Sequence, residues 1–94
     1  MIKKKRYPNL LRLYRKAHGW DQQQVANFIG IRSRDTISRW ENSHVFPTAI
    51  NIFKLAALYG VMADKLFSPL TTALWQEKIK RQKKLYKQEI KKAS

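Results

Sequence analysis

The sequence predicts an all-α protein, in which one small domain of five short helices is followed by a basic C-terminal helix. The 94 residues have room for one hydrophobic core. Most apolar residues recur at helical spacing. Only 3 Gly and 3 Pro are present, and they fall between the helical stretches. A chain of strands and tight turns is usually richer in both residues, so a β architecture is not expected.

The first predicted helix begins near Pro8, because proline suits the first helical turn, and it ends at Gly19. A second helix follows, with Asp21 as its N-cap and Gln24 as the partner of Asp21 in a capping box. Gly30 ends this helix. The apolar sets are Leu10, Leu11, Leu13, Tyr14 and Ala17 in the first helix, and Val25, Ala26, Phe28 and Ile29 on the buried side of the second.

A third helix is expected to point Ile37 and Trp40 inward, and a fourth helix is expected to be capped by Thr48. A short fifth helix covers about residues 63–67, and Ser68-Pro69 then interrupts the chain. The apolar residues of the fourth helix are Ile52, Leu55, Ala56 and Tyr59.

Charge is the strongest clue to the partner. Twenty Lys and Arg stand against six Asp and Glu, which gives a net charge of +14. Most of this excess lies in a basic arm, residues 1–8, and in a basic amphipathic tail, residues 68–94. Polyanions are the natural partners of such a chain, with nucleic acid ahead of an anionic membrane surface. In the tail, a helix from about residue 70 to 92 carries one thin apolar stripe of Trp75, Ile79, Gln82, Tyr86 and Ile90.

Residues 21–42 have the layout of a helix-turn-helix, since two short helices flank a turn that contains Gly30. Ile31 closes the corner, and Ser33 is a good N-cap for the third helix. Once Ile37 and Trp40 are buried, a polar outer face remains near the start of this helix, where it fits the major groove of DNA. The side chains on that face are Arg34, Asp35, Ser38 and Arg39.

Residues 9–67 resemble the Cro/repressor type of helix-turn-helix domain, the Cro/C1-type or XRE family. The matching stretches are LLRLYRKAHGW, DQQQVANFIGI, TISRWEN and PTAINIFKLAALYGVMADKLF. The resemblance implies a five-helix domain that binds DNA operators, commonly as a symmetric dimer. It implies base contacts by Arg34, Asp35, Ser38 and Arg39, phosphate contacts by Gln22 and Asn42, a bracing role for Gln22, and a structural ion pair between Arg15 and Glu41.

Two features depart from the family pattern. The turn at residues 30–33 is one residue longer than the commonest one, and Ser43 stands where the family often has glycine. Serine adopts a left-handed conformation less readily, so we expect the loop after the third helix to differ. Arg32, in the turn, is expected to meet a phosphate, as are the arm residues Lys3, Lys4 and Lys5. Asp35 can accept from a cytosine amino group or orient Arg39 one helical turn further on.

These patterns predict a transcriptional regulator that binds double-stranded DNA, acting as a repressor by occlusion. A homodimer is expected to form through the fourth and fifth helices, where Ile50, Ala57 and Met62 have no evident core role. His18 and His44 are far apart and no catalytic arrangement is visible, so neither an enzyme, a cofactor nor a metal site is expected. No apolar segment follows the basic residues 1–6, which favours a cytoplasmic protein without membrane contact.

An alternative is an antitoxin-like protein, in which the C-terminal helix binds a protein partner and the helix-turn-helix serves autoregulation. A third class gives the tail a membrane-surface or RNA-binding role. The aromatic residues leave a related choice open. Trp40 is expected in the core and Trp20 as a cap on it, while Trp75 either packs or offers a stacking surface to single-stranded nucleic acid.

Overall fold

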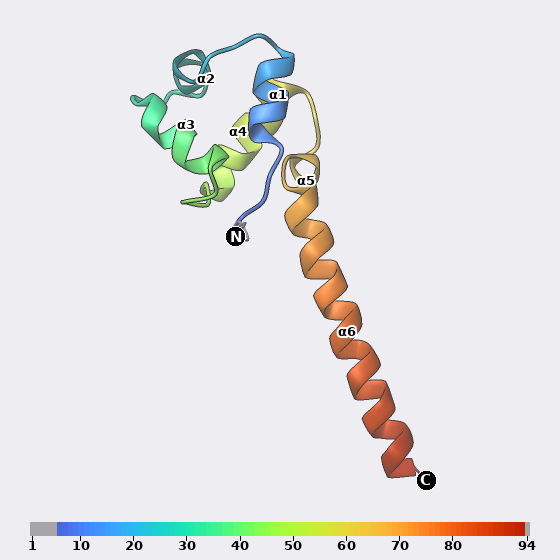
Figure 1. Ribbon diagram of the computed structural model, residues 1–94. Coiled ribbons are helices and arrows are strands. Elements are labelled where there is room, and N and C mark those ends of the chain that lie inside the picture. Colours follow the sequence, from blue (N-terminus) through green and yellow to red (C-terminus); the bar gives the residue numbers. More distant parts are fainter. Residues whose placement is uncertain (1–5, 94) are drawn as a thin grey trace.

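Five short helices surround one core, and a sixth helix extends away from it (Figure 1). This computed structural model describes residues 6–93, and within that range no strand occurs. The predicted all-α fold is therefore confirmed. The helices are α1 (Leu11–Ala17), α2 (Gln22–Ile29), α3 (Arg34–Glu41), α4 (Ala49–Tyr59), α5 (Ala63–Leu66) and α6 (Ser68–Ala93).

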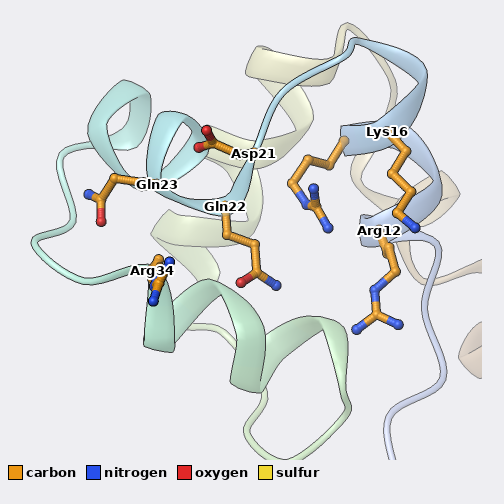
Figure 2. A pocket seen from close by; sticks show the side chains of 7 residues that line it. Arg12, Lys16, Asp21, Gln22, Gln23 and Arg34 are labelled. Carbon is orange, nitrogen blue, oxygen red and sulfur yellow. The ribbon is translucent and has the colours of Figure 1, made fainter.

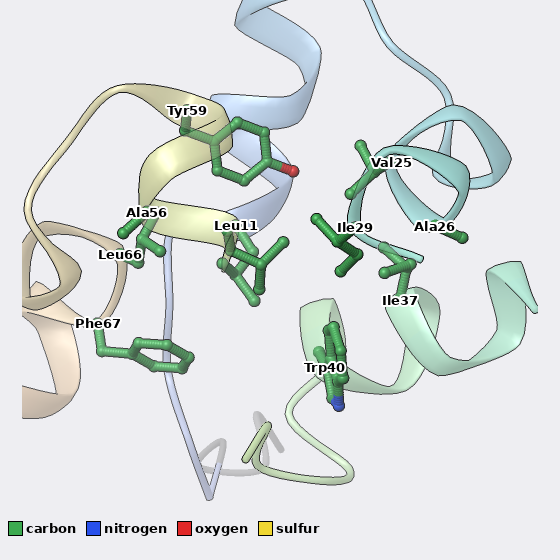
Figure 3. Close-up of a cluster of buried hydrophobic side chains, with 11 residues drawn as sticks. Leu11, Val25, Ala26, Ile29, Ile37, Trp40, Ala56, Tyr59, Leu66 and Phe67 are labelled. Atoms are coloured by element: carbon green, nitrogen blue, oxygen red, sulfur yellow. The ribbon is translucent and has the colours of Figure 1, made fainter. Parts of the chain in front are cut away.

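The core lies between the first five helices (Figure 3). Three apolar residues expected at the helix faces stay outside it: Leu13 is 62% exposed, Phe28 is 54% exposed, and Ala17 is exposed as well. On α2 the buried face is narrower than the sequence suggested, so Phe28 lies beside it, with its ring against Trp20 at a centroid distance of 5.0 Å. The buried apolar residues are Leu11, Val25, Ala26, Ile29, Ile37, Trp40, Leu55, Ala56, Tyr59, Leu66 and Phe67.

The predicted caps of the helix-turn-helix are formed. The carboxylate of Asp21 accepts from the backbone N–H of Gln24 at 2.7 Å, and the Gln24 side chain accepts from the backbone N–H of Asp21 at 2.9 Å. The hydroxyl of Ser33 accepts from the backbone N–H of Asp35 at 3.1 Å. Each bond satisfies an N–H group that a helix start leaves without an internal partner. The turn at residues 30–33 thus ends at Ser33, and Arg34 is the first residue of α3.

Two predicted helix starts differ. The first helix begins at Leu11 rather than near Pro8. At this start, the Asn9 side chain accepts a hydrogen bond from the backbone N–H of Leu11 at 3.1 Å. Thr48 occupies the N-cap position of α4, but its side chain makes no capping hydrogen bond. The packing of the apolar α4 face against the core, more than a cap, therefore stabilises this helix.

The loop after α3 keeps the backbone shape that glycine would allow. Ser43 is buried and has a φ of 65°, the left-handed conformation. Its hydroxyl donates to the backbone carbonyl of Tyr7 at 2.8 Å. Asn9 donates to the same carbonyl and to that of Trp40, each at 2.9 Å. These bonds fasten the segment before α1 to the end of α3, and they offset the conformational cost at Ser43.

The sixth helix leaves the domain almost at once. Leu70 packs against the core, whereas most side chains beyond it are exposed, and Trp75 is 62% exposed. The chain break expected at Ser68-Pro69 falls one residue earlier, at Phe67, because proline is tolerated in the first turn of a helix. No helix in the described part of the chain combines the length and the apolar composition needed to cross a bilayer.

Candidate nucleic-acid interface

The third helix has one buried face and one polar face. Ile37, Trp40 and Glu41 are buried, and Ser38 is half-buried. Three other polar side chains are exposed, namely Arg34 and Asp35 in the first turn and Arg39 in the last turn. Because α3 has eight residues, it is about 12 Å long, close to the ~12 Å width of the major groove of DNA.

The C-terminal end of α3 is fixed to the body by one buried carboxylate. The side chain of Glu41 has no exposed surface and accepts four N–H bonds. Arg15 donates from Nε at 2.7 Å and from Nη2 at 3.1 Å, Gln22 donates at 3.1 Å, and Arg12 donates at 3.4 Å. The Arg15–Glu41 ion pair that the family resemblance implies is thus present in the structure.

Arg15 also connects this carboxylate to the loop before α2. Its Nη1 donates to the backbone carbonyl of Trp20 at 2.9 Å. The hydrogen bond to Glu41 raises the pKa of the Arg15 guanidinium, so this cation stays charged at any working pH. Three helices therefore meet at Glu41: α1 through Arg15, α2 through Gln22, and α3 itself. Such a fully satisfied buried charge holds the helices in one relative position.

A second chain of bonds runs along the outer end of α3. Asn42 donates from its side-chain amide to the Ser38 hydroxyl at 3.1 Å and accepts from Arg12 at 2.7 Å. Ser38 therefore keeps its own hydroxyl proton for an outside acceptor. The amide of Asn42, for which a phosphate contact was predicted, is held in place by Ser38 and Arg12 at the edge of the polar face.

An open concavity of about 490 Å³ lies between α1, α2 and the start of α3 (Figure 2). Four cations and one carboxylate line it, so it favours an anion. Sequence reasoning found Gln22 and Arg34 but not Arg12 and Lys16. The only available signal was their spacing of four residues, which places both on one side of α1. The lining residues are Arg12, Arg15, Lys16, Asp21, Gln22, Gln23 and Arg34.

The predicted base-reading residues are not all in one group. Arg34 lines the concavity with Gln22, whereas Asp35 and Arg39 lie one turn apart on the exposed side of α3. Among the described residues, Asp35 and Arg39 form no ion pair with each other. Arg32 is exposed in the turn between α2 and α3. The predicted phosphate contacts Lys3, Lys4 and Lys5 lie outside the described residues.

The aromatic residues near α1 stack against one another and against the buried Tyr59. His18 stacks on Trp20 at a centroid distance of 4.6 Å and on Tyr59 at 5.7 Å. Trp20 is half-buried by this stack, as expected for a cap on the core, and Trp40 is buried. Burial raises the pKa of the Tyr59 hydroxyl, which therefore stays neutral.

Known proteins that are similar to this chain are helix-turn-helix proteins or a transcription factor. A family model described as helix-turn-helix matches residues 11–66. The fold is similar to the crystal structure of a hypothetical transcription factor, NHTF, from Neisseria, with 35% sequence identity and a TM-score of 0.55. That similarity covers 61% of this chain and 64% of the other, so the chain spans less than two thirds of that protein's length. No curated protein matches the sequence.

Proposed function

This chain belongs to the helix-turn-helix family of the Cro/C1 (XRE) type, and we propose that it is a transcriptional regulator that recognises a DNA operator and represses by occlusion. One observation carries the proposal. A short helix with a polar exposed face, α3, is held at its C-terminal end by the buried carboxylate of Glu41. A fixed helix can present side chains to base edges in a single register, which sequence recognition requires.

Base reading is assigned to the outer face of α3. Arg34 and Arg39 offer the guanidinium fork that matches O6 and N7 of guanine, and Asp35 can accept from the amino group of cytosine. Ser38, whose hydroxyl proton stays available, allows close approach to a base edge. The exposure of the first three side chains supports this assignment.

Phosphate binding is assigned to the concavity beside this helix. Arg12 and Lys16 of α1 carry exposed positive charge, and Gln22 lies at the start of α2, where helix N–H groups favour an anion. Arg32 in the turn and Asn42 at the end of α3 are the other phosphate contacts that we propose. Such contacts set the orientation on the duplex without reading its sequence.

The proposed assembly on DNA is a homodimer. Ile50, Phe53 and Ala57 are exposed at helical spacing on α4, and Met62 is exposed beside α5. An apolar face of this kind is costly in water and is typical of an interface. A two-fold dimer would place two copies of α3 in successive major grooves, about 34 Å apart, so the operator is expected to be palindromic.

Selection of bound duplexes from a random pool tests the proposal, because it expects a palindromic consensus. Arg34→Ala and Arg39→Ala should each weaken binding to that consensus by about 1–3 kcal/mol and relax the preference at particular base pairs. Lys16→Ala is the matched control, since it should weaken consensus and random DNA by the same factor. A pool without any consensus, or equal losses on both DNAs for the two arginine variants, would contradict the assignment.

A further inference from the structure

The sixth helix carries a row of like charges. Lys80, Lys83, Lys84 and Lys87, here called the lysine ridge, line one open concavity of about 290 Å³ along the helix. Their spacing of three, four and seven residues places them on one face, where neighbouring ammonium groups repel each other. The ridge therefore destabilises the isolated helix, and an anionic partner that binds the ridge would relieve this repulsion.

Among the described residues, no acidic side chain forms an ion pair with the ridge. The acidic residues of α6 are Glu77 and Glu89, and in the described part of the protein neither forms an ion pair with a ridge lysine. The helix projects from the domain beyond Leu70, and no other helix of the described chain lies along it (Figure 1). Residues 70–94 as a whole hold eight basic and two acidic residues.

We propose that the lysine ridge is a second DNA-binding surface, which holds backbone phosphates of the duplex that flanks the site bound by α3. This inference rests on the proposed function. The row of charges matches a partner that is itself a row of charges: duplex DNA carries one negative charge per about 1.7 Å of its axis. The Cβ atoms of ridge lysines that are three or four residues apart are about 5–6 Å from each other.

The attachment of α6 to the domain makes the contact efficient. Leu70 is packed against the core, so the helix begins at a fixed point once α3 is bound. The ridge then lies 10 to 17 residues further along, at about 15–26 Å from that point. This reach is shorter than the ~34 Å of one duplex turn. A flanking phosphate that lies within this reach meets the ridge as part of the molecule already bound by α3, which raises its effective concentration.

Other occupants fit the ridge less well. A second α6 would bring two rows of lysines together, and its repulsion is unfavourable in a coiled coil. A membrane or an apolar protein groove would use the stripe of Trp75, Ile79 and Tyr86, which lies on a different side of the helix from the ridge. Only a partner recognised by charge alone needs the ridge and leaves that stripe free.

The test compares two variants of the full chain that lose the same charge. The ridge variant is Lys80→Gln/Lys84→Gln/Lys87→Gln, which lowers the formal net charge from +14 to +11, three charges in all. Binding is measured over a range of salt concentrations on two duplexes: the selected site alone, and that site with about one extra turn on each side. On the long duplex, we expect the log–log salt slope to become shallower by about 2.7, at about 0.9 per phosphate lost.

The control variant is Lys65→Gln/Lys78→Gln/Arg81→Gln, which removes three cations that lie off the ridge. On the long duplex, the salt slope of the control variant should stay closer to that of the native chain than the slope of the ridge variant does. On the short duplex, the ridge variant should have the same salt slope as the native chain. Circular dichroism checks that the ridge variant keeps its helices. Glutamine favours helices, and the substitutions remove the repulsion between the ridge lysines. The free ridge variant should therefore be at least as helical as the native chain.

Three outcomes would overturn the inference. An unchanged salt slope for the ridge variant would show that the ridge does not contact phosphates. Equal slope changes in the ridge and control variants would show that only the net charge of the chain matters. An equal effect of the ridge variant on the short and the long duplex would show that the ridge does not bind the flanking DNA. Random duplexes of both lengths separate this inference from the proposed function. If α3 reads no sequence, the ridge effect on long random DNA persists. If only the ridge fails, Arg39→Ala still lowers affinity for the selected site.

Discussion

Removal of Arg15 is the most direct test of how the domain is held together. Arg15→Ala takes away two of the four donors of Glu41, including the shortest bond at 2.7 Å, and leaves Gln22 at 3.1 Å and Arg12 at 3.4 Å. The Glu41 side chain is 0% exposed, so water cannot replace the lost hydrogen bonds to its carboxylate. Breaking a buried pair in this way costs about 3–5 kcal/mol of folding free energy.

Arg12→Ala is the matched control, because it removes a second arginine that donates to the same carboxylate. The side chain of Arg12 is 46% exposed and its Nε lies 3.4 Å from Glu41, so its loss should cost about 1 kcal/mol or less. For a domain of this size, each kcal/mol lowers the melting temperature by about 4–8 °C. Arg15→Ala should therefore melt at least 12 °C below the native protein, and Arg12→Ala within about 8 °C of it.

Thermal and urea unfolding of both variants would measure this difference. The double variant Arg15→Met/Glu41→Leu adds a second check, since replacing a whole buried pair by apolar residues is often neutral. It should therefore be more stable than Arg15→Ala alone. Equal melting temperatures for Arg15→Ala and Arg12→Ala, or no recovery in the double variant, would show that the cost does not come from a stranded Glu41 charge.

Two further predictions concern the loop after α3 and the apolar face of α4. Ser43→Gly should unfold at nearly the same urea concentration as the native protein, because relief of the left-handed strain offsets the lost bond to Tyr7, whereas Ser43→Ala keeps the strain and should be about 1 kcal/mol less stable. Equal stability of the two variants would argue against strain. Phe53→Glu, at a side chain 62% exposed, should leave the melting temperature unchanged but reduce two chains per operator to one in a mass measurement; a persisting pair would place the interface elsewhere.

Local interactions were predictable from the sequence, whereas the faces of the helices were less so. The caps at Asp21 and Ser33 depend on neighbours two or three residues away, so the pattern of residue types was sufficient. Phe28 was expected to be buried but is exposed, because the width of the buried α2 face is set by how closely α3 and α4 approach it. Helical spacing alone does not contain that information.

Long-range contacts explain what the sequence did not predict at the candidate interface. Ser43 takes the left-handed conformation with help from Tyr7, 36 residues away in sequence. Arg12 and Lys16 line the concavity because α1 packs beside α3, and their spacing of four residues shows only that they share a side of α1, not what that side faces. The Arg15–Glu41 pair, 26 residues apart, was implied only by the family resemblance.

The two ends of α3 differ in burial, although Arg39 of the last turn is exposed. Its last turn contains Trp40 and Glu41, both buried, while its first turn carries Arg34 and Asp35 in solvent. A helix anchored at one end can present the other to DNA without a moving hinge. Gln22 joins the two ends, because it donates to Glu41 and also lines the concavity next to Arg34. The buried carboxylate therefore supports the stability of the domain and fixes the position of the side chains to which we assign DNA binding.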